Sequence, residues 1–427
     1  MIGLLLAAIL ATAPAGSAQA PPDASDLINT LLASLGGFRA VTGPELQKEV
    51  AEAGGVPFRS DVPLDFLSRG ALSAYLKEVL DTEYPPERAS ADERTLVALD
   101  LLPPRPELRR LRARLLEENV AGFYDERPGR KRLFAVSDDR TLTPANQLVL
   151  AHELRHALQD QYADVHGALP ASVGDFDDRR MAYLSLLEGD ATLVMERFLL
   201  RRLPGAPESV GDMGGLAMPP NIMPGVPAVL QDQLLLPYLL GRDFARAVWE
   251  RGGWDALRQA WSRPPVSTEQ VLHPEKYFAG ETPRAPDLPY TPPAGRLINE
   301  GVLGEMLART LLGEGSDVAA AGWGGDLFRV FDVSGRTLLV WASAWDTPAD
   351  AREFAEAARA RFLARHGPAR LEGGFQVFTS GDWRFALAEQ PGRVVLLASD
   401  DAVALQAALA GSAAAADLDN SRERPGY

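Results

Sequence analysis

The spacing of apolar positions divides the chain into a mostly helical part and a C-terminal part rich in short strands. Between residues 22 and 312 the apolar residues recur mainly at every third or fourth position, which is the period of an amphipathic helix. From Leu327 onward they lie in short runs bounded by Gly, Asp and Pro, which is typical of strands. We therefore expect an α+β fold that ends in a domain where helices pack on one sheet.

Turns that contain Gly or Pro set the ends of the predicted elements. Besides a central helix at residues 148–160, the predicted helices of the first part are Ala24–Leu35, Leu64–Leu80, Ala91–Leu101, Glu107–Glu118, Asp177–Arg202, Pro227–Leu240, Arg242–Arg251, Trp254–Trp261 and Leu297–Leu312. A hairpin is predicted at residues 121–137, around Pro128-Gly129. Gly313–Gly325 predicts a linker. The C-terminal strands are expected at Leu327–Val333, Thr337–Ala344, Phe375–Thr379, Trp383–Ala388 and Arg393–Ala398, with helices at Thr347–Arg365 and from about Asp400.

The first twenty residues predict a secretory signal peptide. An apolar run from Ile2 to Ala13 precedes Ala18-Gln19-Ala20, a small-x-small cleavage pattern. No later stretch reaches 18 uninterrupted apolar residues, so we expect no stable membrane span after signal cleavage. The mature chain is expected outside the cytoplasm, either secreted or in the cell envelope. The expected divisions are a signal peptide (1–20), an N-terminal helical region (21–117), a central domain (118–316), a C-terminal α+β domain (317–411) and a disordered tail (412–427).

Charge and cysteine content narrow the possible chemistry. The chain has 427 residues, a formal net charge of −15 and no cysteine. The negative charge argues against nucleic acid and anionic membrane surfaces as partners. Without cysteine there is no disulfide framework and no thiol catalysis, so any metal ligands are His, Asp or Glu.

The central helix is predicted to begin at Thr143 as N-cap, with Pro144 at its first position, and it carries the sequence His152-Glu153-Leu154-Arg155-His156. Residues four apart lie on one face of a helix, so His152 and His156 can offer two imidazole nitrogens to one metal ion. Glu153 lies beside that pair, where its carboxylate can take a proton from a water molecule on the metal. This arrangement is the zinc metallopeptidase signature. The alternative is a buried helix with two hydrogen-bonded histidines.

A third ligand is expected from the next helix. Glu188 lies on an apolar stripe there, and a lone buried carboxylate is costly unless it is paired or binds a metal. The alternative for Glu188 is a buried ion pair with an Arg of its own helix. Asp160 is a rival ligand, but three ligands along one straight helix surround an ion poorly. Asp190 and Asp160 are otherwise expected outside the ligand set, where such a carboxylate can orient a ligand histidine.

The residues His152, Glu153, His156 and Glu188 resemble the pattern of the gluzincins, the zinc peptidases typified by thermolysin. The resemblance covers about residues 118–202. It departs from thermolysin in a longer gap between the two helices and in Thr192, which stands where thermolysin has an Asp four positions after its Glu. The sequences His-Glu-Leu-x-His-Ala-Leu-Gln-Asp-Gln and Leu-Glu-Gly-Asp-Ala also resemble those of a group of poorly characterised bacterial extracytoplasmic metallopeptidases. The resemblance implies a zincin-like catalytic domain, a Zn²⁺ cofactor and a peptide or protein substrate.

The same resemblance suggests roles for His273 and Tyr277. In thermolysin-like enzymes a His and a Tyr outside the metal helix hold the oxyanion of the tetrahedral intermediate. His273 ends a short helix capped by Ser267, and it could instead interact with the helix dipole. His366 is expected to be an ordinary residue at the end of a surface helix.

The expected function is therefore that of a secreted zinc metallopeptidase, with Glu153 as general base. The first alternative is an inactive zincin-derived binding or cell-surface protein that keeps a structural metal. The second is a protein without metal, in which the two helices are only core. The sequence also leaves open whether the hairpin pairs with substrate or only covers the helix, whether residues 203–228 form a lid or an insertion, and whether residues 21–117 are scaffold or an inhibitory pro-segment.

Overall fold

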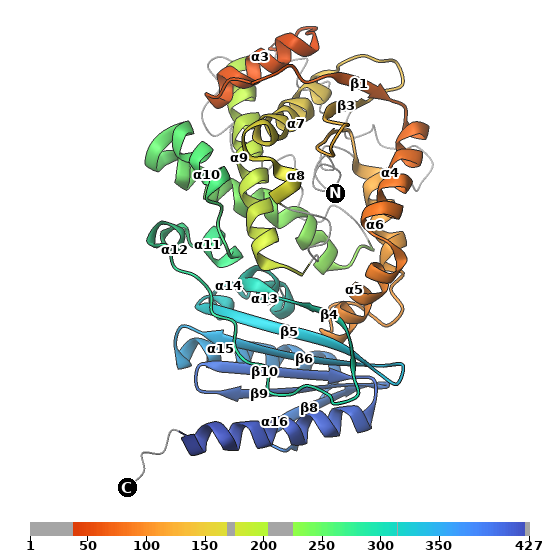
Figure 1. The fold of residues 1–427 in the computed structure, drawn as a ribbon, viewed down its shortest axis with the longest axis vertical. Helices are drawn as coiled ribbons and strands as arrows, with labels where there is room; N and C mark the ends of the chain where they lie inside the picture. Colours follow the sequence, from red (N-terminus) through yellow and green to blue (C-terminus); the bar gives the residue numbers. More distant parts are fainter. Residues whose placement is uncertain (1–36, 169–175, 204–224, 314, 423–427) are drawn as a thin grey trace.

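The computed structural model describes residues 37–168, 176–203, 225–313 and 315–422. Helices fill the upper part of the view in Figure 1, and a large sheet lies below them. The expected α+β class is confirmed at this level, because the chain is mixed and its C-terminal region holds a seven-stranded antiparallel sheet. The predicted signal peptide and the helix at 24–35 lie outside the described residues, as does most of the loop at 203–228. In the described part of the chain, no helix has the length and apolar character needed to cross a membrane.

The N-terminal region contains one strand among its helices. Its elements are α3 (Gly43–Gly54), β1 (Leu64–Leu67), α4 (Arg69–Glu83), α5 (Pro86–Ala98) and α6 (Leu108–Asn119). The sequence pattern missed α3, and its predicted helix Leu64–Leu80 is wrong at the start. Those first residues form β1, which pairs in parallel with β3 (Arg132–Val136). Ser68 then caps α4 by accepting a hydrogen bond from the backbone N–H of Ala71.

The predicted hairpin is present next to the central helix. Strand β2 (Gly122–Asp125) pairs antiparallel with β3. The small sheet has the order β1-β3-β2, so β2 is an edge strand. Helix α7 (Pro144–Ala163) packs against this sheet on one side and against α9 (Asp178–Arg202) on another. The short α8 (Val165–Ala168) follows α7. The sequence predicted α9 almost to the residue.

Helix α10 (Ala228–Ser262) covers three predicted helices, and it is kinked at Gly252 and Gly253, where the sequence predicted the break between the second and the third. Its backbone leaves helical geometry only at Gly252 and Gly253, so the predicted break near Gly241 is wrong. At Gly241, α10 instead crosses α9. A Cβ atom added to Gly189 of α9 would lie 1.9 Å from the carbonyl oxygen of Gly241. The two glycines therefore allow the backbones of α9 and α10 to approach closely, as Figure 1 shows for the two helices.

Several short elements connect α10 to the large sheet. They are α11 (Thr268–Leu272), α12 (Pro274–Ala279), β4 (Arg296–Gly301), α13 (Gly304–Leu312) and α14 (Asp317–Ala320). The predicted helix Leu297–Leu312 is therefore wrong in its first half, because that half pairs with β5 (Trp323–Val333). The predicted linker at 313–325 contains α14 and the start of β5.

The large sheet has the order β4-β5-β6-β10-β9-β8-β7. Its remaining strands are β6 (Arg336–Trp345), β7 (Arg370–Glu372), β8 (Phe375–Ser380), β9 (Trp383–Gln390) and β10 (Arg393–Ser399). All five predicted strands are present, and β4 and β7 were missed. Helix α15 (Pro348–His366) and helix α16 (Ala402–Arg422) pack on opposite faces of the sheet. The structure continues α16 through the tail predicted to be disordered, because the Ala-rich sequence favours helix.

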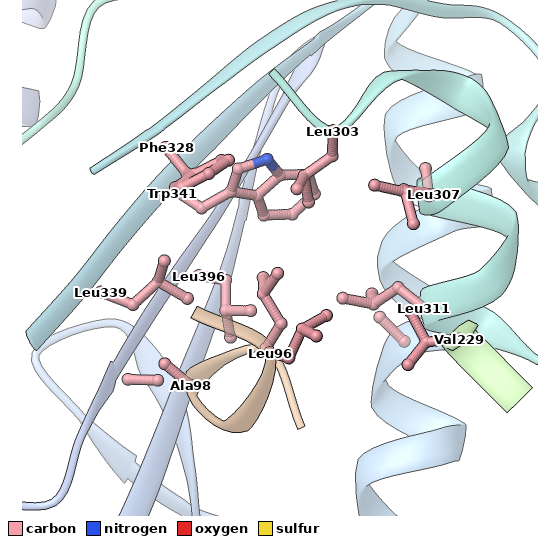
Figure 2. Packing of buried hydrophobic residues seen from close by; sticks show 14 of the residues in the cluster. Leu96, Ala98, Val229, Leu303, Leu307, Leu311, Phe328, Leu339, Trp341 and Leu396 are labelled. Atoms are coloured by element: carbon pink, nitrogen blue, oxygen red, sulfur yellow. The ribbon is translucent and has the colours of Figure 1, made fainter. Parts of the chain in front are cut away.

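One hydrophobic core joins the N-terminal region, the central helices and the sheet. Figure 2 shows Leu96 of α5, Val229 of α10 and Leu307 of α13 in one cluster of buried side chains with Trp341 of the sheet. Leu96 and Trp341 are almost completely buried. The predicted boundaries at residues 117 and 316 therefore do not separate independent cores. Of the two interpretations of the N-terminal region, this packing favours the scaffold.

Candidate functional site

The two histidines of the central helix point their ring nitrogens at each other. His152 and His156 lie four residues apart on α7, and their Nε2 atoms are 3.0 Å apart. The rings meet edge to face, with their centroids 4.7 Å apart. Both side chains are buried. Helical spacing therefore produces the paired nitrogens that the sequence predicted.

Helix α9 brings Glu188 to both histidines. Its Oε2 lies 3.1 Å from Nε2 of His152, and its Oε1 lies 3.5 Å from Nε2 of His156. Glu188 is completely buried, and its Oε1 accepts no hydrogen bond from the described residues. The alternative ion pair between Glu188 and an Arg of α9 is not what the structure contains. The fully buried Arg in this region is Arg155 of α7, and its partner is Asp190.

The charges of the three groups favour one positive charge between them. Burial lowers the pKa of His152. Burial also acts to lower the pKa of His156, but Glu188 and Glu153 outweigh it and raise this pKa to about 9. For Glu188, burial acts to raise the pKa, but His156 and His152 outweigh it and hold the pKa below its usual value. The carboxylate of Glu188 thus stabilises a positive charge on the ring of His156.

Glu153 lies beside the three groups with one free oxygen. Its Oε2 accepts a 2.9 Å hydrogen bond from the backbone N–H of Tyr124 on the edge strand β2. Its Oε1 is buried and has no hydrogen-bond donor among the described residues. Burial raises the pKa of Glu153 to about 8. Glu153 is therefore held by one oxygen and can exchange a proton at the other. The contact from Tyr124 was not predicted, because a backbone donor leaves no signal in the residue pattern.

Asp190 reaches the histidines only through another side chain. It accepts hydrogen bonds from Arg155, from Nε1 of Trp261 at 3.0 Å and from Nε2 of Gln159 at 2.9 Å. The amide oxygen of Gln159 in turn lies 2.8 Å from Nδ1 of His156. The side chain that holds the histidine is therefore Gln159, which the sequence analysis missed. Its position three residues after His156, on the same helix face, is the signal that could have identified it.

The structure places Asp160 away from the histidines. Its Oδ2 accepts a hydrogen bond from the hydroxyl of Tyr124 at 2.9 Å and lies 3.0 Å from Nζ of Lys131. The predicted roles of Asp160 as a rival ligand or as a direct partner of a ligand histidine are therefore corrected. Helix geometry explains this, since Asp160 lies a full turn beyond His156 and binds the hairpin instead.

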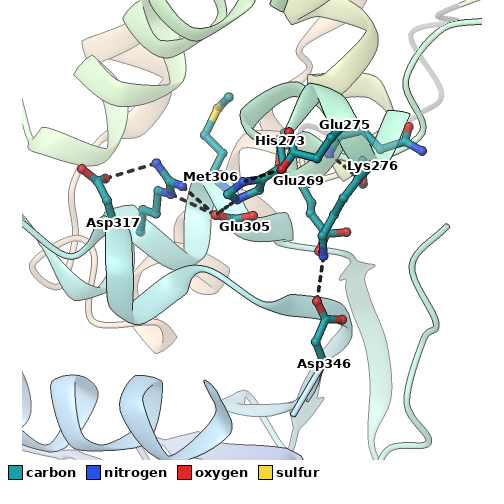
Figure 3. Close-up of polar contacts among 12 residues, drawn as sticks. Glu269, His273, Glu275, Lys276, Glu305, Met306, Asp317 and Asp346 are labelled. Carbon is teal, nitrogen blue, oxygen red and sulfur yellow. Dashed lines mark hydrogen bonds and ion pairs between the residues drawn. The ribbon is translucent and has the colours of Figure 1, made fainter. Parts of the chain in front are cut away.

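His273 and Tyr277 have partners of their own. Figure 3 shows Nε2 of His273 next to Glu305, with a separation of 3.0 Å. The hydroxyl of Tyr277 donates a 2.8 Å hydrogen bond to the carbonyl oxygen of Arg263. None of the contacts described for these two residues reaches His152, Glu153, His156 or Glu188. The predicted role of His273 and Tyr277 as oxyanion holders therefore receives no geometric support and is not carried forward.

Tyr238, which the sequence pattern did not single out, also contacts one of the histidines. Tyr238 of α10 stacks its ring on His152, with centroids 5.6 Å apart. Burial, Glu188 and Glu153 together raise the pKa of Tyr238 well above its usual value, so its hydroxyl stays protonated.

His366 is not an ordinary surface residue, because its side chain is buried and its Nε2 lies 3.0 Å from Oδ2 of Asp100.

The donor set fits a zinc ion. Two imidazole nitrogens and one carboxylate are the ligands of catalytic zinc sites that keep one position open for water. His152, His156 and Glu153 also offer ligand atoms within 4.8 Å of one another. A second group of carboxylates, formed by Glu269, Glu281 and Asp346, surrounds the ammonium group of Lys276, as Figure 3 shows in part. The positive charge of Lys276 already neutralises part of the charge of these carboxylates, so they are not a candidate metal site.

Comparison with known proteins reaches only the C-terminal region, which holds the large sheet and helices α13 to α16. Residues 294–419 match a family model described as a domain of unknown function, DUF8575. The match begins before β4 and ends within α16, so it starts earlier than the predicted boundary at residue 317 and leaves out α7 and α9. No curated protein and no solved structure matches the chain.

Proposed function

We propose that this protein is a zinc-dependent metallopeptidase that hydrolyses peptide bonds. The observation that carries the proposal is the meeting of His152, His156 and Glu188 around one point, with the free Oε1 of Glu153 beside them. His152, His156 and Glu188 would hold the metal. Glu153 would accept and deliver a proton. The predicted signal peptide adds the proposal that the enzyme works outside the cytoplasm.

The metal, Glu153 and the backbone of Tyr124 would have separate roles in the hydrolysis. Zinc, when bound, supplies a Lewis acid that polarises the substrate carbonyl and brings the pKa of a water molecule to about 7. Glu153 accepts the proton of the attacking water at Oε1 and later delivers it to the leaving amine. The backbone N–H of Tyr124 holds the other oxygen, so the carboxylate cannot rotate freely. Buried surroundings keep bulk water away from this proton transfer.

The position of β2 suggests how a peptide would lie. Strand β2 is at the edge of the small sheet, and its residue Tyr124 contacts the general base. All four residues of β2 are buried, so a peptide would add to this edge as a further strand, running past Glu153, only once the cover of the strand opens. This favours an extended peptide substrate over a folded one.

One observation favours the alternative of a structural metal. His152, Glu153, His156 and Glu188 are all buried, as in closed metal sites that have no open position. The intact Glu153 with its free oxygen argues for catalysis, since a closed site needs no base.

Metal analysis paired with a proteolysis assay distinguishes the two. We expect about one zinc per chain and cleavage of fluorescent casein that a chelator stops and added zinc restores. Bound zinc without any cleavage would select the structural metal. Purified protein that takes up no zinc would exclude both.

A further inference from the structure

A buried chain of hydrogen bonds connects His156 to the carboxylate of Asp190. Nδ1 of His156 lies 2.8 Å from Oε1 of Gln159, and Nε2 of Gln159 lies 2.9 Å from Oδ2 of Asp190. Gln159 and Asp190 are completely buried. The three residues come from α7 and α9, the two helices that carry the candidate ligands.

The surroundings fix the orientation of the Gln159 amide. Its nitrogen faces two acceptors, the carboxylate of Asp190 and the carbonyl oxygen of Leu187 at 3.0 Å. A rotated amide would point its oxygen at these acceptors, so this rotation is excluded. The amide oxygen therefore faces His156, and Nδ1 of that ring must be the donor. In the neutral ring, this leaves Nε2 as the nitrogen with a free electron pair for a metal.

Asp190 is itself anchored. Arg155 makes two hydrogen bonds of 2.9 Å to its carboxylate, and Trp261 donates a third of 3.0 Å. Arg155 is fully buried and also donates to the carbonyl oxygen of Gly54, at 3.3 Å. The far end of the chain is thus fixed by groups from α3, α7 and α10.

We propose that Gln159 is the positioning residue of the metal centre, and that it holds His156 as the Nδ1–H tautomer and links it to Asp190. The role rests on the proposed metal function of His156. Glutamine suits this place because its amide accepts from a ring N–H and donates to a carboxylate at the same time. A glutamate could accept from the ring, but it would face Asp190 as a second negative charge.

The experiment compares Gln159→Leu and Gln159→Glu with Gln161→Leu. Gln161 is the matched control, because it lies on the same helix and contacts the backbone of Arg59 and Ser60 instead of a histidine. Zinc affinity is measured by competition with a chromophoric chelator. The tautomer of His156 is read from ring nitrogen resonances after selective histidine labelling, in metal-free protein at a pH where the ring is neutral, because zinc on Nε2 would leave the proton on Nδ1 whatever its partner. The chain has only five histidines, so assignment is practicable.

We expect Gln159→Leu to bind zinc about 10–100-fold more weakly and to lose the Nδ1–H resonance of His156. Gln159→Glu should keep that resonance, because its carboxylate still accepts from the ring, but its negative charge opposite Asp190 should leave the zinc affinity between those of Gln159→Leu and wild type. Gln161→Leu should match wild type in both measurements. Gln159→Glu also serves if Gln159→Leu does not fold.

Two results would reject the positioning role of Gln159 without rejecting the proposed zinc binding. Unchanged zinc affinity and ring resonances in Gln159→Leu would show that Gln159 positions nothing, while zinc binding itself stands. Loss of zinc affinity in Gln159→Leu with an unchanged Nδ1–H resonance of His156 would assign only a packing role. Wild-type protein that binds no zinc would remove the metal function and the positioning role together, even if the metal-free protein shows the Nδ1–H resonance.

Discussion

Gly189 of α9 lies directly against Gly241 of α10, with no space for a side chain between the two backbones. A Cβ atom at residue 189 would be 1.9 Å from the carbonyl oxygen of Gly241. This close crossing places α10 beside the segment of α9 that carries Glu188, and it brings Tyr238 onto the ring of His152. The glycine in the sequence Glu188-Gly189-Asp190 is therefore a packing requirement.

We expect Gly189→Ala to destabilise the protein by about 1–3 kcal/mol or more, because the added methyl group must push two helices apart. Urea unfolding measures the change. Gly70→Ala is the control, since Gly70 lies in helix α4 with nothing within 4 Å of an added Cβ, and it should be neutral or slightly stabilising. Equal stability of Gly189→Ala and wild type would contradict the close crossing.

Replacement of the two buried glutamates should separate catalysis from metal binding. Glu153→Gln keeps the shape of the side chain and removes the base, so zinc content should stay near wild type while peptidase activity falls about 10²–10⁴-fold. Glu188→Gln removes a ligand charge, so zinc affinity should fall together with activity. Metal analysis and the casein assay measure both. Loss of zinc in Glu153→Gln, with zinc retained in Glu188→Gln, would reverse the two assignments.

Zinc should stabilise the fold through binding to the native state only. At a free zinc concentration of 100 times Kd, the expected gain is about 2.7 kcal/mol, which calorimetry detects as a rise in Tm that a chelator reverses. His152→Ala and His156→Ala should abolish the rise. His366→Ala is the matched control, because its buried ring binds Asp100 instead, so it should lower Tm yet keep the zinc-dependent rise. A rise that survives in both ligand variants would place the zinc elsewhere.

The stability of the protein should depend on the protonation of Asp178. Burial raises the pKa of Asp178 from 3.8 to about 8 in the folded chain, although Thr268 donates two hydrogen bonds to it. The folded state therefore binds a proton that the unfolded state has released between about pH 4 and pH 8. This contribution to stability is complete below about pH 4 and is lost as the pH rises to about 8.

Asp178→Asn should consequently flatten the fall in stability between pH 6 and pH 8, because the amide cannot ionise. Urea unfolding at several pH values measures the slope. Asp255→Asn is the control, since its carboxylate is 81% exposed, and it should keep the wild-type slope. An unchanged slope in Asp178→Asn would show that this carboxylate is ionised throughout the range.

The N-terminal region should be needed for folding. Leu96 of α5 is completely buried in the core that includes Trp341 of the sheet, so Leu96→Ala should cost about 2–5 kcal/mol. Leu363→Ala should cost little, because that side chain is 53% exposed. Unfolding followed by tryptophan fluorescence compares the two. Little loss of stability in Leu96→Ala would reopen the possibility of a removable pro-segment.

The sequence by itself predicted most of the helices, the hairpin, five strands of the large sheet and the residues that meet at the candidate metal centre. Thr143 and Pro144 mark the start of α7 as predicted. The spacing of four residues between His152 and His156 places both side chains on one face of this helix. The apolar stripe of α9 singled out Glu188 before its partner was known. These features depend on contacts between residues three or four apart, so the pattern along the chain is enough to predict them.

The tertiary structure decided everything that depends on a partner far away in the chain. Leu64–Leu67 and Arg296–Gly301 became strands because β3 and β5 pair with them, although their local pattern suggested helix. Gly241 stayed within a helix because another helix crosses it. The partners of Asp160 and His273 likewise come from the hairpin and from α13. Strand pairing and helix crossing satisfy backbone groups and exclude water between distant segments, and no local periodicity records which segments will meet.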